Sequence, residues 1–229
     1  MMVIFMKWVI SLGGSTFIPE SIDIRFIKGF IELTEAQALK GDDFRIVCGG
    51  GKICRHYTNA IKEAKSAKEI DGFKIGTLVT RVNGFLLMKF FDGKLCYDKV
   101  VINYDKWLGT TKKIVIGAGH KLGHSTDFDA LSFAKAEKVK TIINVTNTKF
   151  VYDSDPKKNN NALPIDKISW KDYIKMVDRS FKPGDNFPFD PIASRGCEKK
   201  RIKVIVVGKD LDNLKSLFEG KDFIGTTIE

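Results

Sequence analysis

The chain has 229 residues, of which 43% are hydrophobic and 29% charged, and it carries a formal net charge of +10. This length suits one α/β domain or at most two small ones, and no apolar run is long enough to span a bilayer. The lysines are spread along the chain without an arginine-rich run. Composition therefore favours solvated lysine faces with a few phosphate contacts over a nucleic-acid-binding surface.

The four cysteines and the first ten residues bear on where the protein resides. Cys48, Cys54, Cys96 and Cys197 form no Cys-x-x-Cys pair, which is typical of reduced thiols in a cytosolic protein. The apolar start lacks a basic leading segment and a small-residue cleavage site, so we expect a buried strand there and not a signal peptide. A cytoplasmic location follows as an expectation.

The first half of the chain predicts two strand–turn–helix units. In chain order these are a strand at Lys7–Leu12, a turn at Gly13–Ser15, a helix from Ser21 or Asp23 to about Gly41, a strand at Phe44–Cys48, a turn at Gly49–Gly51 and a helix from about Ile53. The next segment, residues 73–91, is ambiguous. Its β-branched and aromatic residues favour a strand, whereas the spacing of Leu78, Val82 and Phe85 fits a helix.

The second half continues the alternation of strands and helices. In chain order we predict short strands at Val100–Ile102 and Ile114–Ile116, a glycine-rich turn, a helix at Asp127–Val139, a strand at Thr141–Val145, a polar loop at Asn147–Leu163, a helix from Ser169 to about Arg179, a loop at Phe181–Pro191, a strand at Ile202–Val207, a helix at Leu211–Phe218 and a last strand at Phe223–Ile228. Such alternation predicts a parallel sheet with helices on both faces.

Three glycine-rich turns carry the chemistry. Gly13–Ser15, Gly49–Lys52 and Gly117–Thr126 each follow a predicted strand and precede a helix. Backbone N–H groups at a helix start bind anions, and glycine allows a close approach. The carboxyl ends of parallel strands meet at one edge of the sheet, so we expect the three turns to cluster there. Gly13–Gly14 alone could equally be an ordinary turn, but together the turns suggest two phosphate-bearing ligands.

The order of several motifs resembles the amino-acid-kinase fold family, and most of all its archaeal-type UMP kinases. The resembling segments are Leu12–Ser15, Val47–Tyr57, Gly76–Asn83, Gly123–Asp127, Thr146–Lys158, Asp190–Ala193 and Gly225–Ile228. The resemblance implies one domain over residues 1–229, an α/β/α three-layer sandwich with a mostly parallel central sheet. It implies transfer of a phosphoryl group from ATP, accompanied by Mg²⁺, to UMP. Family members are commonly hexamers; we expect neither a membrane nor nucleic acid as a partner.

The resemblance also implies roles for individual residues. Those expected in catalysis are Gly14, Ser15, Arg55 and Arg195. Those expected to bind ATP are Gly14, Ser15, Gly51, Arg55, Thr146, Asn147, Tyr152 and Asp155. Those expected to bind UMP are Gly50, Asp71, His120, Gly123, His124, Ser125 and Thr126. His120 could equally be a surface or turn residue, and we assign no metal ligand. Arg81 and Asn83 match the family pattern as well, and we interpret them as packing between subunits.

Several positions depart from the family pattern. The acid expected to bind the UMP ribose falls at Phe73, with Asp71 displaced by about two residues, and the turn before His124 is one residue longer. Lys149 stands where an acid is usual, and Arg195 replaces a lysine. These changes keep open a kinase of the same fold acting on another phosphate, carboxylate or carbamate acceptor, or a non-catalytic nucleotide or oxyanion binder.

Overall fold

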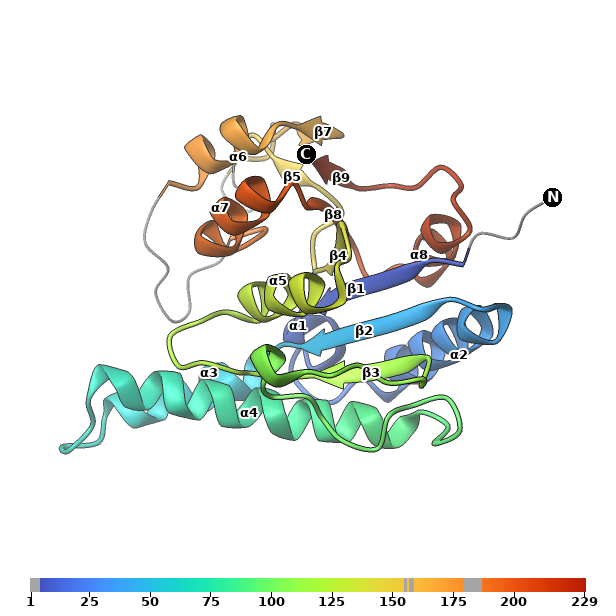
Figure 1. Ribbon diagram of the computed structural model, residues 1–229. Helices are drawn as coiled ribbons and strands as arrows, with labels where there is room; N and C mark the ends of the chain where they lie inside the picture. Colours follow the sequence, from blue (N-terminus) through green and yellow to red (C-terminus); the bar gives the residue numbers. More distant parts are fainter. Residues whose placement is uncertain (1–4, 155, 157–158, 179–186) are drawn as a thin grey trace.

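The computed structural model describes residues 5–154, 156, 159–178 and 187–229 (Figure 1). Its strands are β1 (Lys7–Leu12), β2 (Asp43–Cys48), β3 (Ile114–Gly117), β4 (Thr141–Val145), β5 (Val151–Tyr152), β6 (Pro164–Ile165), β7 (Lys167–Ile168), β8 (Lys203–Val207) and β9 (Thr226–Ile228). Its α-helices are α1 (Gly14–Phe17), α2 (Ile24–Lys40), α3 (Gly51–Lys62), α4 (Glu69–Phe90), α5 (Thr126–Glu137), α6 (Trp170–Met176), α7 (Pro191–Lys200) and α8 (Leu211–Phe218), and η1 (Tyr104–Lys106) is a 3₁₀ turn.

The main sheet of the described chain has the strand order β3-β2-β1-β4-β8-β9-β7. The first five of these strands are parallel, with β1 between β2 and β4. Strand β9 is antiparallel to β8, and β7 is parallel to β9, so this edge of the sheet runs in the opposite direction. The predicted mostly parallel α/β sheet is confirmed. The parallel strands bring the loops after β1, β2 and β3 to one edge.

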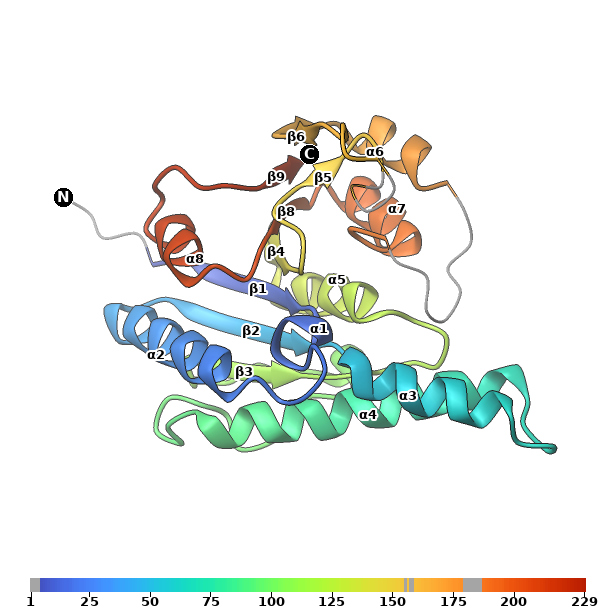
Figure 2. The same cartoon turned by 180° about the vertical axis from the view of Figure 1, so that it is seen from behind.

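Helices cover both faces of the sheet because each strand alternates its side chains between them. In β1, Ile10 and Leu12 pack in the core beneath α2, α4 and α8, whereas Val9 packs in the core beneath α5, α6 and α7. Both cores consist mainly of fully buried aliphatic and aromatic residues. The molecule is therefore a three-layer α/β/α sandwich, as the two opposite views show (Figures 1 and 2).

Side-chain caps define where several helices begin. Asp23 caps α2 by accepting a hydrogen bond from the Phe26 N–H, which decides between the two candidates for this cap. Ser125, Ser169 and Asp210 cap α5, α6 and α8 in the same way. The ambiguous segment 73–91 belongs to the long helix α4, because its spacing buries Val79, Leu87 and Met88 on one face.

The structure also corrects parts of the sequence-based assignment. Val100–Ile102 is not a strand, since only Val101 forms an isolated bridge, to Gly117. The predicted polar loop contains β5, which pairs with β6, and α6 ends at Met176 and not near Arg179. Helix α7 has no counterpart among the predicted elements, although Asp190 as cap and a proline in the first turn are typical start signals. Of the loop predicted at Phe181–Pro191, residues 181–186 lie outside the described residues.

Two further observations concern the surface. No helix in the described part of the chain is both long and apolar enough to cross a membrane. Helix α3 and the first half of α4 extend past the end of the sheet as a pair (Figures 1 and 2). Among the residues described, α3 contributes no fully buried side chain. The α3–α4 pair therefore packs against the rest of the chain only at the end that lies next to the sheet.

Candidate active site

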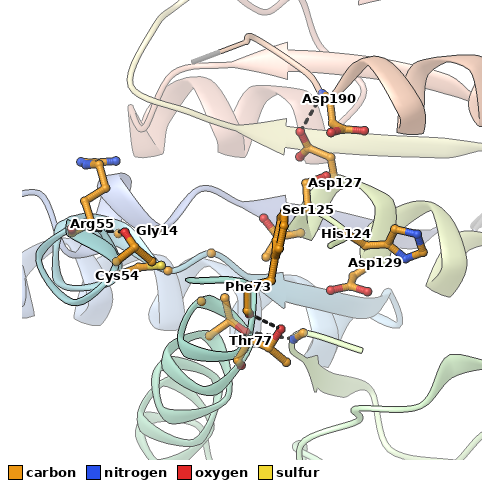
Figure 3. Close-up of a pocket in the computed structure, with 18 of the residues that line it drawn as sticks. Gly14, Cys54, Arg55, Phe73, Thr77, His124, Ser125, Asp127, Asp129 and Asp190 are labelled. Carbon is orange, nitrogen blue, oxygen red and sulfur yellow. Dashed lines mark hydrogen bonds between the residues drawn. The ribbon is translucent and has the colours of Figure 1, made fainter. Parts of the chain in front are cut away.

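A cavity of about 640 Å³ opens at the carboxyl edge of the parallel strands (Figure 3). Its walls come from the loops after β1, β2 and β3 and from α3, α4, α5 and the start of α7. The principal lining residues are Gly14, Ser15, Gly49, Gly50, Gly51, Arg55, Phe73, Thr77, Thr80, Gly119, His124, Ser125, Thr126, Asp127, Asp129, Asn147 and Asp190. The expectation that the three glycine-rich turns meet at one edge is thereby confirmed.

The loops after β1 and β2 touch each other backbone to backbone. A Cβ atom on Gly14 would overlap the backbone nitrogen of Gly51, and one on Gly49 would overlap the nitrogen of Gly14. Gly51 also has a φ angle of 67°, a conformation that residues with a side chain rarely adopt. Glycine is therefore required at these positions, and the contact brings the backbone N–H groups of two loops into one wall of the cavity.

Helix α4 holds these loops in place from below. The buried Asn83 side chain donates hydrogen bonds to the carbonyl oxygens of Gly49 and Gly50, at 2.9 and 3.1 Å. Arg81 Nε donates to the Gly119 carbonyl at 3.0 Å, and the Gly119 N–H donates to Thr80 Oγ1 at 3.1 Å. Asn83 and Arg81 thus position cavity loops within one chain. Their interpretation as residues that pack between subunits stays a prediction.

The end of the cavity near α3 suits a phosphate group. Arg55 is exposed at this end, and no hydrogen bond or ion pair from the described residues engages its guanidinium group. Ser15 Oγ accepts a hydrogen bond of 2.8 Å from Asn147 Nδ2, which links the loop after β1 to the loop after β4. The first turn of α5 begins at Ser125 and Thr126, whose N–H groups lie at the positive end of the helix dipole.

Two carboxyl groups, the half-buried Asp127 and the buried Asp190, lie between the end of β1 and the start of α7. Asp127 accepts a hydrogen bond of 2.7 Å from Ser11 Oγ and one of 2.9 Å from the Asp190 N–H. Burial, together with the neighbouring Asp190 carboxyl, raises the pKa of Asp127 to about 7. Burial also raises the pKa of Asp190, which caps α7 through the Ala193 N–H at 2.6 Å. Asp127 therefore changes charge close to neutral pH.

The chain is similar to proteins of known family over almost its whole length. The model of the amino acid kinase family matches residues 6–208. The chain belongs to this family. A uridylate kinase of Thermococcus kodakarensis is 35% identical over 228 residues, which cover 98% of this chain and 100% of that protein. A uridylate kinase of Archaeoglobus fulgidus is 32% identical over 224 residues, covering 97% of this chain and 100% of the relative.

Solved structures of kinases from this family resemble the present fold. The crystal structure of uridylate kinase from Archaeoglobus fulgidus matches with a TM-score of 0.83 and 29% identity, and covers 99% of this chain and 100% of that chain. The UMP kinase of Bacillus anthracis matches with a TM-score of 0.78 over 97% of this chain and 95% of its own, and at 19% identity it shows the fold alone. The expected amino-acid-kinase fold is confirmed.

The structure brings most of the site residues expected of an amino acid kinase to the cavity. Those that line it are Gly14, Ser15, Gly50, Gly51, Arg55, His124, Ser125, Thr126 and Asn147. Those outside its lining are Asp71, His120, Gly123, Thr146, Tyr152 and Arg195. Asp155 lies outside the described residues. For all of these residues, roles in binding or catalysis stay predictions.

Three residues outside the lining have structural contacts of their own. Asp71 accepts from the Lys68 N–H at 3.0 Å and pairs with Lys74, so it caps the start of α4. His120 binds the Ile102 carbonyl through Nδ1 at 2.9 Å and lies beside Asp105. Arg195 forms an ion pair with Asp178.

Sequence reasoning missed four polar residues that line or support the cavity. Asp127, Asp190 and Thr80 fell within segments that resemble the family, but like Asp129 they were given no role at this site. The sequence signal for Asp127 was its place in the first turn of a helix that follows a glycine-rich turn. Asp129 has no comparable signal, because only the placement of α5 beside the loop after β3 brings it to the cavity.

Proposed function

We propose that this protein is an ATP-dependent UMP kinase, which transfers the γ-phosphoryl group of ATP to UMP and yields UDP and ADP. The observation that carries the proposal is the direct contact between the glycine loops after β1 and β2, beside the N-terminus of α5. Two facing loops of backbone donors suit two phosphate groups that must approach each other. UMP as the acceptor is supported by the similarity to uridylate kinases over almost the full length of the chain.

The chemistry requires alignment and charge neutralisation more than a strong base. An oxygen of the UMP phosphate attacks the γ-phosphorus of ATP, the bond to the bridging β–γ oxygen breaks, and ADP leaves with that oxygen. In this proposal Gly50 holds the UMP phosphate, whereas Gly14, Ser15, Gly51 and Arg55 hold the transferred group. His124, Ser125 and Thr126 hold the rest of UMP.

The donor nucleotide would lie along the loop after β4. Thr146, Asn147, Tyr152 and Asp155 are proposed to contact ATP, and Arg195 to approach its phosphates. Mg²⁺ would be held mainly by phosphate oxygens, since the described residues contain no group of three His, Cys, Asp or Glu side chains suited to a metal. The ion would neutralise phosphate charge.

The proposal extends to the whole protein. We propose one domain over residues 1–229, a cytoplasmic location in pyrimidine nucleotide synthesis, and a homo-oligomer, with a hexamer as the state implied by family resemblance. An apolar stripe on α4 supports self-association: Leu78, Val82 and Phe85 follow helical spacing and are 55–68% exposed.

One observation favours a second candidate, a kinase of this fold with a different acceptor. Phe73 lies in the cavity wall on α4, where the family resemblance leads us to expect an acid for the UMP ribose. A phenyl ring cannot accept a hydrogen bond from a ribose hydroxyl as a carboxylate does, so the acceptor could differ from UMP in its sugar.

An ADP-release assay with ATP and Mg²⁺ distinguishes the two candidates. The acceptors are UMP, CMP, dUMP, isopentenyl phosphate and carbamate, each at several concentrations. Turnover with UMP above all others supports the proposal, and preferred turnover of another acceptor supports the second candidate. If none is turned over while UMP still raises the melting temperature, the chain binds nucleotides without kinase activity, and the proposal is wrong.

A further inference from the structure

Two buried polar atoms lack partners at one end of the cavity. Within the described residues, neither Asp129 Oδ1 nor His124 Nδ1 has a hydrogen-bond partner. Both residues line the cavity, and both belong to the segment around the start of α5. The His124 ring lies 4.0 Å from the Phe128 ring, between centroids, and burial lowers the pKa of His124, so the imidazole is neutral at neutral pH.

Asp129 is held so that one oxygen remains available. Its Oδ2 accepts a hydrogen bond from the His120 N–H at 3.3 Å, which ties the carboxyl group to the loop after β3. Only 1% of the residue is exposed. Asp129 lines the cavity, so a turn of its side chain would present the unpartnered Oδ1 to a ligand there.

A purely structural role does not account for this carboxyl. A buried polar atom without a partner lowers the stability of the folded protein, and an apolar residue at the same place would avoid that loss. Burial also raises the pKa of Asp129 to about 8, which reflects how poorly the folded protein stabilises its charge. A costly group that faces a ligand cavity is more often retained for the ligand than for the fold.

The position of Asp129 within the cavity indicates which part of a nucleotide it would meet. Arg55 and Gly14 lie at one side of the cavity, and His124 and Asp129 at the other, with Phe73 between them (Figure 3). The acceptor phosphate must lie next to the transferred group at Gly14 and Arg55, so the acceptor's base would point towards Asp129. Phe73 offers an aromatic surface along the way, on which a sugar or base ring can pack.

We infer that Asp129 determines acceptor specificity by hydrogen bonding, through Oδ1, to the edge of the acceptor's pyrimidine ring at N3–H and the 4-oxygen. This inference rests on the proposed function, because it takes the acceptor to be a uracil nucleotide. An ionised carboxylate accepts from N3–H, and a neutral carboxyl donates to the 4-oxygen, so both forms recognise the same edge. A small rotation of the side chain towards the cavity accompanies binding.

The test compares two acceptors in wild-type protein and in variants. The acceptors are UMP and the monophosphate of pyrimidin-2-one riboside, which lacks both N3–H and the 4-oxygen. The variants are Asp129→Ala and Asp129→Val, which remove the unpartnered Oδ1 together with Oδ2, the acceptor of the His120 N–H, so the melting temperature is measured to show that they fold. Asp98→Asn, an exposed carboxyl outside the cavity lining, is the matched control. The dissociation constant and kcat/KM are measured for each pair, together with ATP affinity and melting temperature.

In wild type and in the control, UMP is expected to exceed the analogue by about tenfold or more in kcat/KM and in affinity, the scale of one lost hydrogen bond. In both Asp129 variants the ratio of UMP to the analogue, in kcat/KM and in affinity, should fall below about threefold, while the affinity for ATP stays unchanged. The inference would be overturned if the ratio of UMP to the analogue in the variants equalled that of wild type, or if wild type did not prefer UMP over the analogue. If UMP binds but is not phosphorylated, the proposed function fails and the affinity gap still decides the inference; if UMP does not bind, both fail.

Discussion

Arg55 is the exposed cation at the phosphate end of the cavity, and its guanidinium group has no partner among the described residues. A charge-assisted hydrogen bond to a phosphate contributes about 1.5–3 kcal/mol, so Arg55→Ala should lower kcat/KM for UMP by at least about tenfold. Steady-state kinetics of ADP release measure the effect. Arg25→Ala, another exposed arginine, is the control and should leave kcat/KM unchanged. An unaltered value for Arg55→Ala would exclude this residue from the site.

Asp127 makes stability depend on pH. Its folded-state pKa is about 7, above the unfolded value, because burial disfavours the charged form. The folded state therefore holds more protons than the unfolded state between about pH 4 and 7, and stability falls as the pH rises through this range. Asp129, with a pKa of about 8, and Asp190 act in the same direction.

We expect the melting temperature of wild type to be lower at pH 8.5 than at pH 5.5. Asp127→Asn keeps the shape of the side chain and should bind Ser11 Oγ and the Asp190 N–H without titrating. In this variant the difference between the two pH values should shrink by several degrees. Calorimetry at the two pH values measures it, and an equally large difference in the variant would show that Asp127 does not titrate in this range.

At the scale of elements, the site depends on backbone contact between the loops after β1 and β2. The Cβ of Gly14→Ala would overlap Gly51, and the loops must separate to admit it. A displacement on the order of 1 Å can cost about a hundredfold in rate, so kcat/KM should fall by about that factor. Gly93→Ala, where no atom lies within 4 Å of the added Cβ, is the control. Activity of Gly14→Ala near that of Gly93→Ala would mean that the loop contact is not needed.

The sequence predicts elements that local contacts define better than elements that depend on contacts between distant residues. The buried strands and their glycine turns were predicted because local apolar runs and turn residues define them, as in β1 and β4. Helix α4 stayed ambiguous, since its composition favours a strand and only tertiary packing on Leu87 and Met88 selects the helix.

The site shows the same division between local and distant contacts. Glycine turns are visible in the sequence, but the support of Gly49 and Gly50 by Asn83 joins residues more than thirty positions apart. Asp129 likewise reaches the cavity only because α5 packs beside the loop after β3. No periodicity or spacing within the sequence encodes such contacts.

For the whole molecule, Glu137 at the end of α5 joins three other parts of the chain. It pairs with Arg45 of β2 at 2.8 Å and Lys7 of β1 at 2.6 Å, and accepts from Trp107 Nε1 at 2.7 Å. Burial opposes its charge, but these hydrogen bonds hold the pKa of Glu137 at about 2. Arg45 is 1% exposed, so its charge depends on this partner.

Glu137→Gln should therefore destabilise the protein by about 3–5 kcal/mol, the cost of leaving a buried charge without its counter-ion. Urea unfolding measures the loss. Because Glu137 is not among the residues that line the cavity, the kcat of the folded variant should stay close to wild type. Glu219→Gln, which removes a surface partner of Lys40 and Lys221, should change stability little. Equal stabilities of the two variants would contradict the role given to Glu137.

The α3–α4 pair leads to a prediction about assembly. Leu78, Val82 and Phe85 form an exposed stripe on α4, and a second copy of the chain presenting the same stripe would bury it in an isologous contact. Light scattering should then give a mass that is a multiple of 25.7 kDa. Val82→Glu places a charge in the stripe, so it should lower the mass. Leu39→Glu, at an exposed leucine on α2, should not. An unchanged mass for Val82→Glu would place the contact between copies elsewhere on the surface.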